Sequence, residues 1–353
     1  LLTHDRSGVD LEYWNEMDRR IQYALETYPF LQLQLILYGE DREEVLRYAE
    51  NDSASQLIAR YAQARFAAYP NIQWCISNDL DITAVKSSRA IHPEIIDRIG
   101  TDLRAREPWG TLLTNHQKRF SGYAFATSDW SDIVTVEDMD QVTGEAVLKY
   151  RRLCDDPVVN DEDRYGIYRS PKHDRYFFRR LMWASLLSGG HATYGGLETY
   201  EAFDSIDGTK GVHGYRTAVN DGRLDDGAHD FQWIHQFFRD TQITLAGFQP
   251  ADEIAGGNVA LAKASSDGEN VIIYLQNPDV STPETADVRE SHAQITPMLP
   301  PGTWKLRWFD PRSGRWHDAS QPCITSSEFR DVLISPFTGD SILLLQSGRE
   351  PSD

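Results

Sequence analysis

The chain has 353 residues, 40% of them hydrophobic, and its formal net charge is -19 at pH 7. This length can bury a sizeable core and is typical of two domains. The charge argues against nucleic acid as a partner, because binding a phosphate backbone needs clustered lysine and arginine, and no apolar run reaches the roughly 20 residues of a membrane-spanning helix. We therefore expect a soluble protein that binds neither nucleic acid nor membrane.

The N-terminal two thirds of the sequence alternates between helical and strand patterns. Leu11, Trp14, Met17, Ile21 and Leu25 have helical spacing, and a strand pattern of apolar residues follows them. The predicted helices are residues 11–26, 55–70, 92–106, 143–153, 175–190 and 231–241. The predicted strands are residues 31–41, 71–81, 110–117, 131–138, 157–163 and 191–198. This alternation indicates parallel strands joined by crossovers.

The pattern changes at about residue 250. Short predicted strands at residues 258–265, 270–277, 302–310 and 341–346 are separated by Gly, Pro, Ser and Asp, without a helical period. This arrangement predicts a small antiparallel β-sandwich. We expect two domains, a catalytic α/β domain at residues 1–248 and an all-β sandwich at residues 249–353.

Polar or ionisable residues follow nearly every predicted strand of the first domain. They are Glu40, Asp41, Asn78, Asp79, Asp81, Asn115, His116, Glu137, Asp138, Asp161, Glu162, Asp163, Tyr194 and Glu198. In a (β/α)8 barrel the active site is built from loops at the carboxyl ends of the strands, whereas a doubly wound sheet gathers its ligand groups at one switch point. The pattern favours a (β/α)8 barrel of TIM-barrel type.

Carboxylates on several strand ends, with the aromatic residues Trp74, Trp130, Tyr165 and Tyr194 nearby, suit sugar chemistry. Cleavage of a glycosidic bond passes through an oxocarbenium-like state, so one carboxylic acid protonates the leaving oxygen while a second carboxylate acts on the anomeric carbon. Two acids on two strands meet this need without a cofactor. The histidines, including His229 and His235, lack ligand spacing, so no metal is expected.

Several of these segments resemble the retaining clan A glycoside hydrolases. Residues 69–81, YPNIQWCISNDLD, look like the fourth-strand motif, in which an Asn precedes the acid/base. Residues 157–166, PVVNDEDRYG, look like the seventh strand, in which Tyr follows the Glu nucleophile by three residues. Residues 177–196 and 302–316 resemble the eighth-strand region and the appended β-domain of the apiosidase-like and endoglucanase-type families. The resemblance implies a retaining glycosidase with Asp79 as acid/base and Glu162 as nucleophile.

The sequence departs from this family pattern in two ways. Most clan A enzymes have Glu where this chain has Asp79, one methylene shorter, although the apiosidase-like branch is similar in using Asp. Counted from the fourth strand, residues 31–37 form the third strand, so the first two strands have no counterpart, and six strands do not close an eight-stranded barrel. We therefore expect an N-terminal barrel segment or another polypeptide to pair with strands 31–37 and 191–196.

Each candidate site residue also has a structural interpretation. Glu162 could instead be a solvated loop acid, with Asp161 or Asp163 as the catalytic residue. Asp79 could instead be a helix N-cap or part of an ion pair, with Asp81 as its substitute. Asn78 is a candidate donor to the sugar 2-hydroxyl or a turn residue. The other candidate substrate contacts are His116, Trp130, Tyr165 and Tyr194, which could instead be a structural histidine, a structural anchor and core aromatics. The alternative functions are an inactive carbohydrate-binding barrel and a metal-dependent barrel hydrolase.

Overall fold

The computed structural model describes residues 1–84, 90–137, 143–162, 175–194, 225–258, 262–280, 289–318, 323–325 and 331–348. The chain forms two compact units, Leu1–Asp138 with Tyr150–Val159, and Met139–Lys149 with Asn160–Asp353. The boundaries of these units differ from the predicted domain boundary between residues 248 and 249. That boundary stays a prediction. None of the described helices is both long and apolar enough to cross a bilayer.

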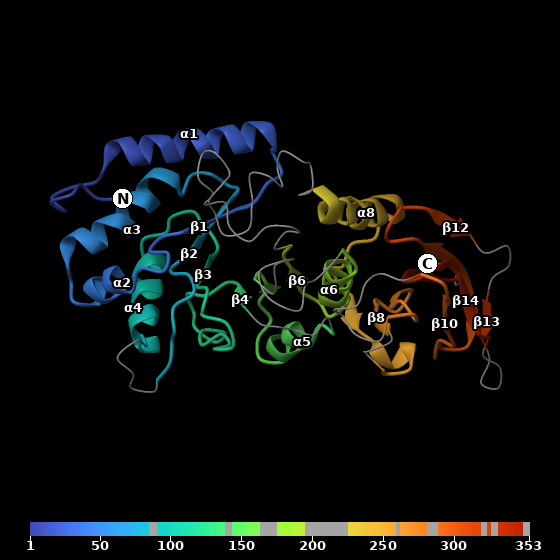
Figure 1. Ribbon diagram of the computed structural model, residues 1–353. Coiled ribbons are helices and arrows are strands. Elements are labelled where there is room, and N and C mark those ends of the chain that lie inside the picture. The colour runs from blue at the N-terminus through green and yellow to red at the C-terminus, as the bar shows by residue number, and fades with distance from the viewer. Residues whose placement is uncertain are drawn as a thin grey trace, which may run out of the picture. The chain divides into compact units, whose positions relative to one another are not determined.

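The first unit contains a parallel sheet with the strand order β1-β2-β3. The strands of this sheet are β1 (Leu33–Ile36), β2 (Ile72–Cys75) and β3 (Leu113–Thr114), and the unit also contains β4 (Val134–Val136). Its helices are α1 (Leu11–Thr27), α2 (Arg42–Ala49), α3 (Ser53–Phe66) and α4 (Pro93–Arg104), and Figure 1 shows them in blue to teal beside these strands. β1, β2 and β3 are parallel because helices cross back between β1 and β2 and between β2 and β3.

Aspartate side chains start three of these helices. Asp10 accepts the backbone N–H groups of Glu12 and Tyr13 in α1, and Asp52 accepts that of Ser55 in α3. Asp41 accepts the N–H of Glu44 at 3.1 Å and so caps α2, a helix that the periodicity did not predict. Each cap satisfies an N–H group that has no partner within the helix. The acid that follows β1 therefore has a structural role.

Backbone pairing continues beyond the strands toward their carboxyl ends. The Tyr38 N–H donates to Ile76 O at 3.1 Å, and the Ile76 N–H donates to Thr114 O at 3.0 Å. One step further, the Asn78 N–H donates to Gly39 O at 2.8 Å. The ends of β1, β2 and β3 therefore lie side by side at one edge of the sheet.

Strand β4 lies next to β3 in the same unit. The Asp132 N–H donates to Leu113 O at 2.9 Å, and the Thr114 hydroxyl donates to Ile133 O at 2.6 Å. The strand is fully buried. Its carboxyl end, which leads to Glu137, consequently lies beside the end of β3.

Strand β5 (Val158–Asn160) belongs to both units, because the division falls after Val159. The helix before it is α5 (Glu145–Arg151). In the first unit, the Val134 N–H of β4 donates to Pro157 O at 2.9 Å, just before β5. In the second unit, the Thr193 N–H, which follows β6 (His191–Ala192), donates to Asn160 O at 3.0 Å. All six predicted strands of the α/β part are thus present.

The second unit consists of helices packed on antiparallel sheets. It includes α6 (Arg175–Leu187), α8 (Asp225–Thr241) and a 3-10 helix, η1 (Asp252–Ala255). One sheet has the order β12-β11-β15-β9-β8-β7, with β13 also paired to β11, and β10 pairs with β14 in another. These strands are β7 (Gln249–Pro250), β8 (Ala262–Ser266), β9 (Asn270–Leu275), β10 (His292–Ile295), β11 (Gly302–Phe309), β12 (Trp316–Asp318), β13 (Cys323–Thr325), β14 (Leu333–Thr338) and β15 (Ser341–Ser347).

Both faces of the larger sheet are buried along β9 and most of β15. Val271 and Ile273 of β9 face a layer that includes Ala293 and Ile295 of β10. The alternate residues, such as Tyr274, face α6 and α8 on the other side. This explains why β9 and β15 have continuous apolar runs and do not alternate between apolar and polar residues. Helices of the α/β part thus share one core with the C-terminal sheet.

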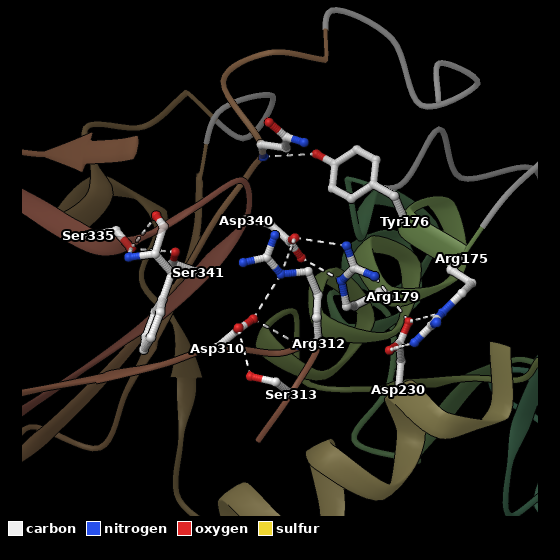
Figure 2. Close-up of polar contacts among 12 residues, drawn as sticks. Arg175, Tyr176, Arg179, Asp230, Asp310, Arg312, Ser313, Ser335, Asp340 and Ser341 are labelled. Atoms are coloured by element: carbon white, nitrogen blue, oxygen red, sulfur yellow. Dashed lines mark hydrogen bonds and ion pairs between the residues drawn. The ribbon is translucent and has the colours of Figure 1, made fainter. Parts of the chain in front are cut away.

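A buried cation joins α6 and α8 to that sheet. The Arg179 guanidinium of α6 donates to both Asp340 carboxylate oxygens, at 2.7 and 2.8 Å, and to Asp230 of α8 at 3.0 Å (Figure 2). All three side chains are at most 1% exposed. The Tyr274 hydroxyl of β9 donates to Asp340 at 3.1 Å. Burial alone would lower the pKa of Arg179, but Asp340 and Asp230 raise it well above its usual range.

We expect Arg179→Met to lower the free energy of unfolding by about 3–5 kcal/mol, because two buried carboxylates lose the cation they share. Arg239→Met is the control, because the Arg239 side chain is 72% exposed and lies 4.0 Å from Asp240. The control should change stability little. Urea unfolding measures both variants, and equal stability of Arg179→Met and wild type would contradict this role for Arg179.

Candidate active site

The end of β2 places Asp79 on the surface in an unusual backbone conformation. Ser77 is fully buried, Asn78 is half-buried and Asp79 is exposed. The φ angle of Asp79 is +54°, in the left-handed region. Asp adopts this region more readily than most residues, but the conformation costs about 1–3 kcal/mol and persists only where the surroundings enforce it. The turn after β2 therefore presents an exposed acid on a backbone that its surroundings hold in place.

The end of β3 supplies the contacts that hold this turn. The backbone N–H and the hydroxyl of Ser77 both donate to Asn115 Oδ1, at 3.0 and 2.8 Å. The His116 N–H donates to Ser77 O at 3.1 Å. The Asp79 N–H donates to His116 Nδ1 at 3.4 Å. His116 is 1% exposed and lies directly beneath the turn.

The end of β4 places a buried acid beside His116. Glu137 is 7% exposed, and its carboxylate lies 2.5 Å from Arg119 Nε. A ring nitrogen of His116 lies within 4.8 Å of a Glu137 carboxylate oxygen. Glu137 is therefore a buried acid paired with Arg119, and is not a loop residue surrounded by water. Its partner Arg119 was not among the predicted site residues, because nothing in its local sequence distinguishes it from a surface arginine.

A layer of hydroxyl groups supports these strand ends from below. Thr114 contacts the Tyr123 hydroxyl at 3.1 Å and Thr135 Oγ1 at 3.0 Å. The Tyr123 hydroxyl lies 2.7 Å from Ser131 Oγ. Burial raises the pKa of Tyr123 well above its usual range, so this hydroxyl stays neutral. These bonds fix β3 against β4 and hence the spacing of His116 and Glu137.

The sequence left two roles open for Trp130, a contact to the sugar or a structural anchor, and the structure places it as an anchor. It is 3% exposed, and its indole N–H donates to Asp97 Oδ1 at 2.8 Å. The ring lies against Gly100 of α4, where a Cβ atom would come within 2.3 Å of it, and packs against Phe125. A ring enclosed in this way has no free face for a sugar. Trp74 is likewise core, at 1% exposure.

In the second unit, the end of β5 carries the predicted nucleophile. Asn160 is fully buried, whereas Asp161 and Glu162 are half-buried. The Thr193 hydroxyl donates to the Asp161 backbone carbonyl. Glu162 therefore lies at a strand end whose backbone is held by the residue after β6. Asp163, Tyr165, Asp138 and Glu198 lie outside the described residues.

Tyr194 follows β6 and packs among aromatic side chains. Its ring meets Phe178 of α6 edge-on at 5.0 Å and Phe231 of α8 at 4.9 Å. The residue is half-buried. The packing fixes the ring, as expected for a core tyrosine, while its predicted contact with substrate stays a prediction.

Solved structures of glycoside hydrolases share this fold. A glycoside hydrolase of family 5 from Bacteroides vulgatus has a TM-score of 0.74 at 16% identity, over 96% of this chain and 75% of that chain. A second structure, named as a glycoside hydrolase, has a TM-score of 0.72 at 15% identity, over 95% of this chain and 77% of that chain. Together with acids at the carboxyl ends of parallel strands, these similarities define an α/β protein with a glycoside hydrolase fold.

The family follows from the sequence match. The profile described as "Apiosidase-like, catalytic domain" matches residues 1–244, well over half of the chain, so the protein belongs to this family. The predicted resemblance to apiosidase-like glycoside hydrolases is thereby confirmed, and hydrolysis of glycosidic bonds is its general chemistry. None of the curated proteins matches the sequence.

Trp130→Phe should reduce the free energy of unfolding by about 1–3 kcal/mol, because a buried hydrogen bond to the Asp97 carboxylate is lost. The KM for any hydrolysed glycoside should stay unchanged. Trp109→Phe is the control, since Trp109 is 69% exposed and its replacement should alter neither quantity. A raised KM with unchanged stability would instead identify Trp130 as a sugar-binding surface.

Proposed function

We propose that the protein is a retaining glycosidase in which Asp79 is the acid/base and Glu162 is the nucleophile. The observation that carries this proposal is the end of β2, where Asp79 is exposed in a left-handed conformation enforced by Asn115 and His116. Membership in the apiosidase-like family supports the same assignment, because that branch is similar in placing Asp after the fourth-strand Asn.

The reaction would proceed in two steps. In the first, the Glu162 carboxylate attacks the anomeric carbon while Asp79 gives its proton to the leaving oxygen, which releases the alcohol and forms a glycosyl ester. In the second, Asp79 removes a proton from water, which attacks the same carbon and frees Glu162. This mechanism requires the two carboxyl groups to lie about 5–5.5 Å apart.

The neighbouring residues are assigned roles by their burial. Asn78 is half-buried beside Asp79, and we propose that its amide donates to the sugar 2-hydroxyl. His116 and Glu137 are buried, so they would not touch the sugar directly. They would instead orient the exposed residues at the strand ends, such as Asp79. We also propose that Tyr194 and Tyr165 orient Glu162, and for Tyr165 the resemblance supports this role, because a Tyr follows the nucleophile by three residues.

The (β/α)8 barrel is part of this proposal, and so is its completion by another segment. Among the described residues, β1 is the end strand of the sheet β1-β2-β3, and Ile36 at its carboxyl end is 42% exposed. Just before β1, Phe30 is 95% exposed. Unpaired strand edges with apolar neighbours are unfavourable in water, which supports pairing of a further polypeptide strand with β1.

An inactive carbohydrate-binding barrel is the second candidate function. It is favoured by Asp79, whose carboxyl group is one methylene closer to the backbone than that of Glu. A binding protein would retain sugars without turnover. Hydrolysis of any glycoside by the purified protein would exclude it.

We expect hydrolysis of at least one member of a panel of aryl glycosides that includes furanosides and apiosides, with a plant- or microbe-derived carbohydrate as the natural substrate class. Proton NMR of the first-formed sugar should show the anomeric configuration of the substrate, because two displacements at one carbon restore it. A product of inverted configuration would contradict the covalent mechanism.

Glu162→Gln and Asp79→Asn should differ in their dependence on the leaving group. Glu162→Gln should abolish turnover of every substrate, whereas Asp79→Asn should spare glycosides of acidic phenols, which need little protonation on departure. Steady-state kinetics on matched dinitrophenyl and phenyl glycosides measures this difference. The opposite pattern would exchange the two roles, and residual activity in both variants would point to Asp161, Asp163 or Asp81.

A further inference from the structure

Ser77, two residues before Asp79, is held mainly by the residues that follow β3. Its N–H and its hydroxyl donate to one atom, Asn115 Oδ1, at 3.0 and 2.8 Å. Its carbonyl accepts the His116 N–H at 3.1 Å. All three polar groups of Ser77 are thus bonded to the two residues that directly follow β3, and the Ser77 carbonyl also accepts from Cys75 Sγ at 3.2 Å.

These contacts are shielded from water. Ser77 and Asn115 are fully buried, and His116 is 1% exposed. Hydrogen bonds in such surroundings are stronger than exposed ones, and a missing partner costs more because water does not replace it. The clamp formed by Asn115 and His116 on Ser77 therefore fixes the backbone at this point.

The clamp accounts for the conformation of Asp79. A left-handed aspartate needs neighbours that enforce it, and the chain between Ser77 and Asp79 contains a single residue. On the far side, the Lys118 N–H donates to Leu80 O at 3.1 Å, so the turn is tied to the end of β3 on both sides. These ties fix the backbone from which the Asp79 side chain projects.

We propose that Asn115 is a positioning residue that sets the Asp79 carboxyl group for proton transfer to the leaving oxygen. This inference rests on the proposed function, because it assigns to Asn115 a role through the acid/base. Asn115 itself lies too deep to touch a sugar. Its amide oxygen is the atom that matters, because in the part of the chain that the structure describes, Nδ2 is buried without a hydrogen-bond partner.

The variants test the Asn115 amide oxygen, which accepts both bonds from Ser77, separately from the amide nitrogen. Asn115→Ala removes the acceptor for both Ser77 donors, whereas Asn115→Asp keeps an oxygen at that position. Ser77→Ala removes only the hydroxyl bond and serves as the milder change should Asn115→Ala fail to fold. Gln63→Ala is the matched control, because Gln63 is 6% exposed and its amide donates to Leu103 O at 3.0 Å, away from the strand ends.

The kinetic readout is the dependence of kcat/KM on the leaving group. General acid catalysis contributes about 10²–10⁴-fold, so a misplaced acid in Asn115→Ala should slow phenyl glycosides by about 10–100-fold. Dinitrophenyl glycosides should slow by less than about 3-fold, since they need little protonation. Asn115→Asp should restore part of the loss, and Gln63→Ala should change both substrates equally. If Asn115→Ala and Ser77→Ala each slowed phenyl and dinitrophenyl glycosides by the same factor, the inference would be overturned.

Hydrogen exchange separates this inference from the proposed function. The amides of Ser77 and Asp79 should exchange faster in Asn115→Ala than in wild type, and at the wild-type rate in Gln63→Ala. Unchanged exchange in Asn115→Ala would overturn the positioning role even in an active enzyme. If the wild-type protein hydrolyses no glycoside, the proposed function fails, while faster exchange would still support the clamp of Asn115 on the Asp79 turn.

Discussion

Parallel pairing of β1, β2 and β3 is the constraint on which the candidate site depends. Parallel strands end at the same edge of a sheet, so the residues after each strand become neighbours although they are far apart in the sequence. The bond from the Asn78 N–H to Gly39 O and the clamp on Ser77 are direct results of this pairing. A slip of one residue in register would turn His116 and Asp79 to opposite faces.

The carboxylates at the strand ends serve different purposes, although they look alike in the sequence. Asp41 caps α2, Glu137 forms an ion pair with Arg119, and Asp79 is exposed in a strained turn. An acid that satisfies helix N–H groups or a buried cation is already committed to structure. Asp79 differs because its carboxyl group is exposed while its backbone is tightly held, so it is free to take the acid/base role that we propose for it.

The C-terminal sheet is joined to the helices of the α/β part by a shared core and a shared charge. Arg179 of α6 is enclosed by Asp340 and Asp230, and Figure 2 shows the guanidinium between the two carboxylates. Removing one partner would leave a charge in surroundings that do not solvate it. The sheet therefore stabilises α6, the helix between β5 and β6, through a shared core and shared ion pairs.

The sequence by itself determined the six strands of the α/β part and most of their helices, because long periodic segments show their buried face through spacing alone. Helix α2 was missed, since it has eight residues and begins at an aspartate that also suits a strand end. Only the tertiary structure decided that Trp130 is an anchor, because the gap that accepts its ring is left by Gly100 of another element. The partners of Ser77 and Arg179 were likewise hidden, since contacts between distant residues depend on how elements pack and leave no local pattern.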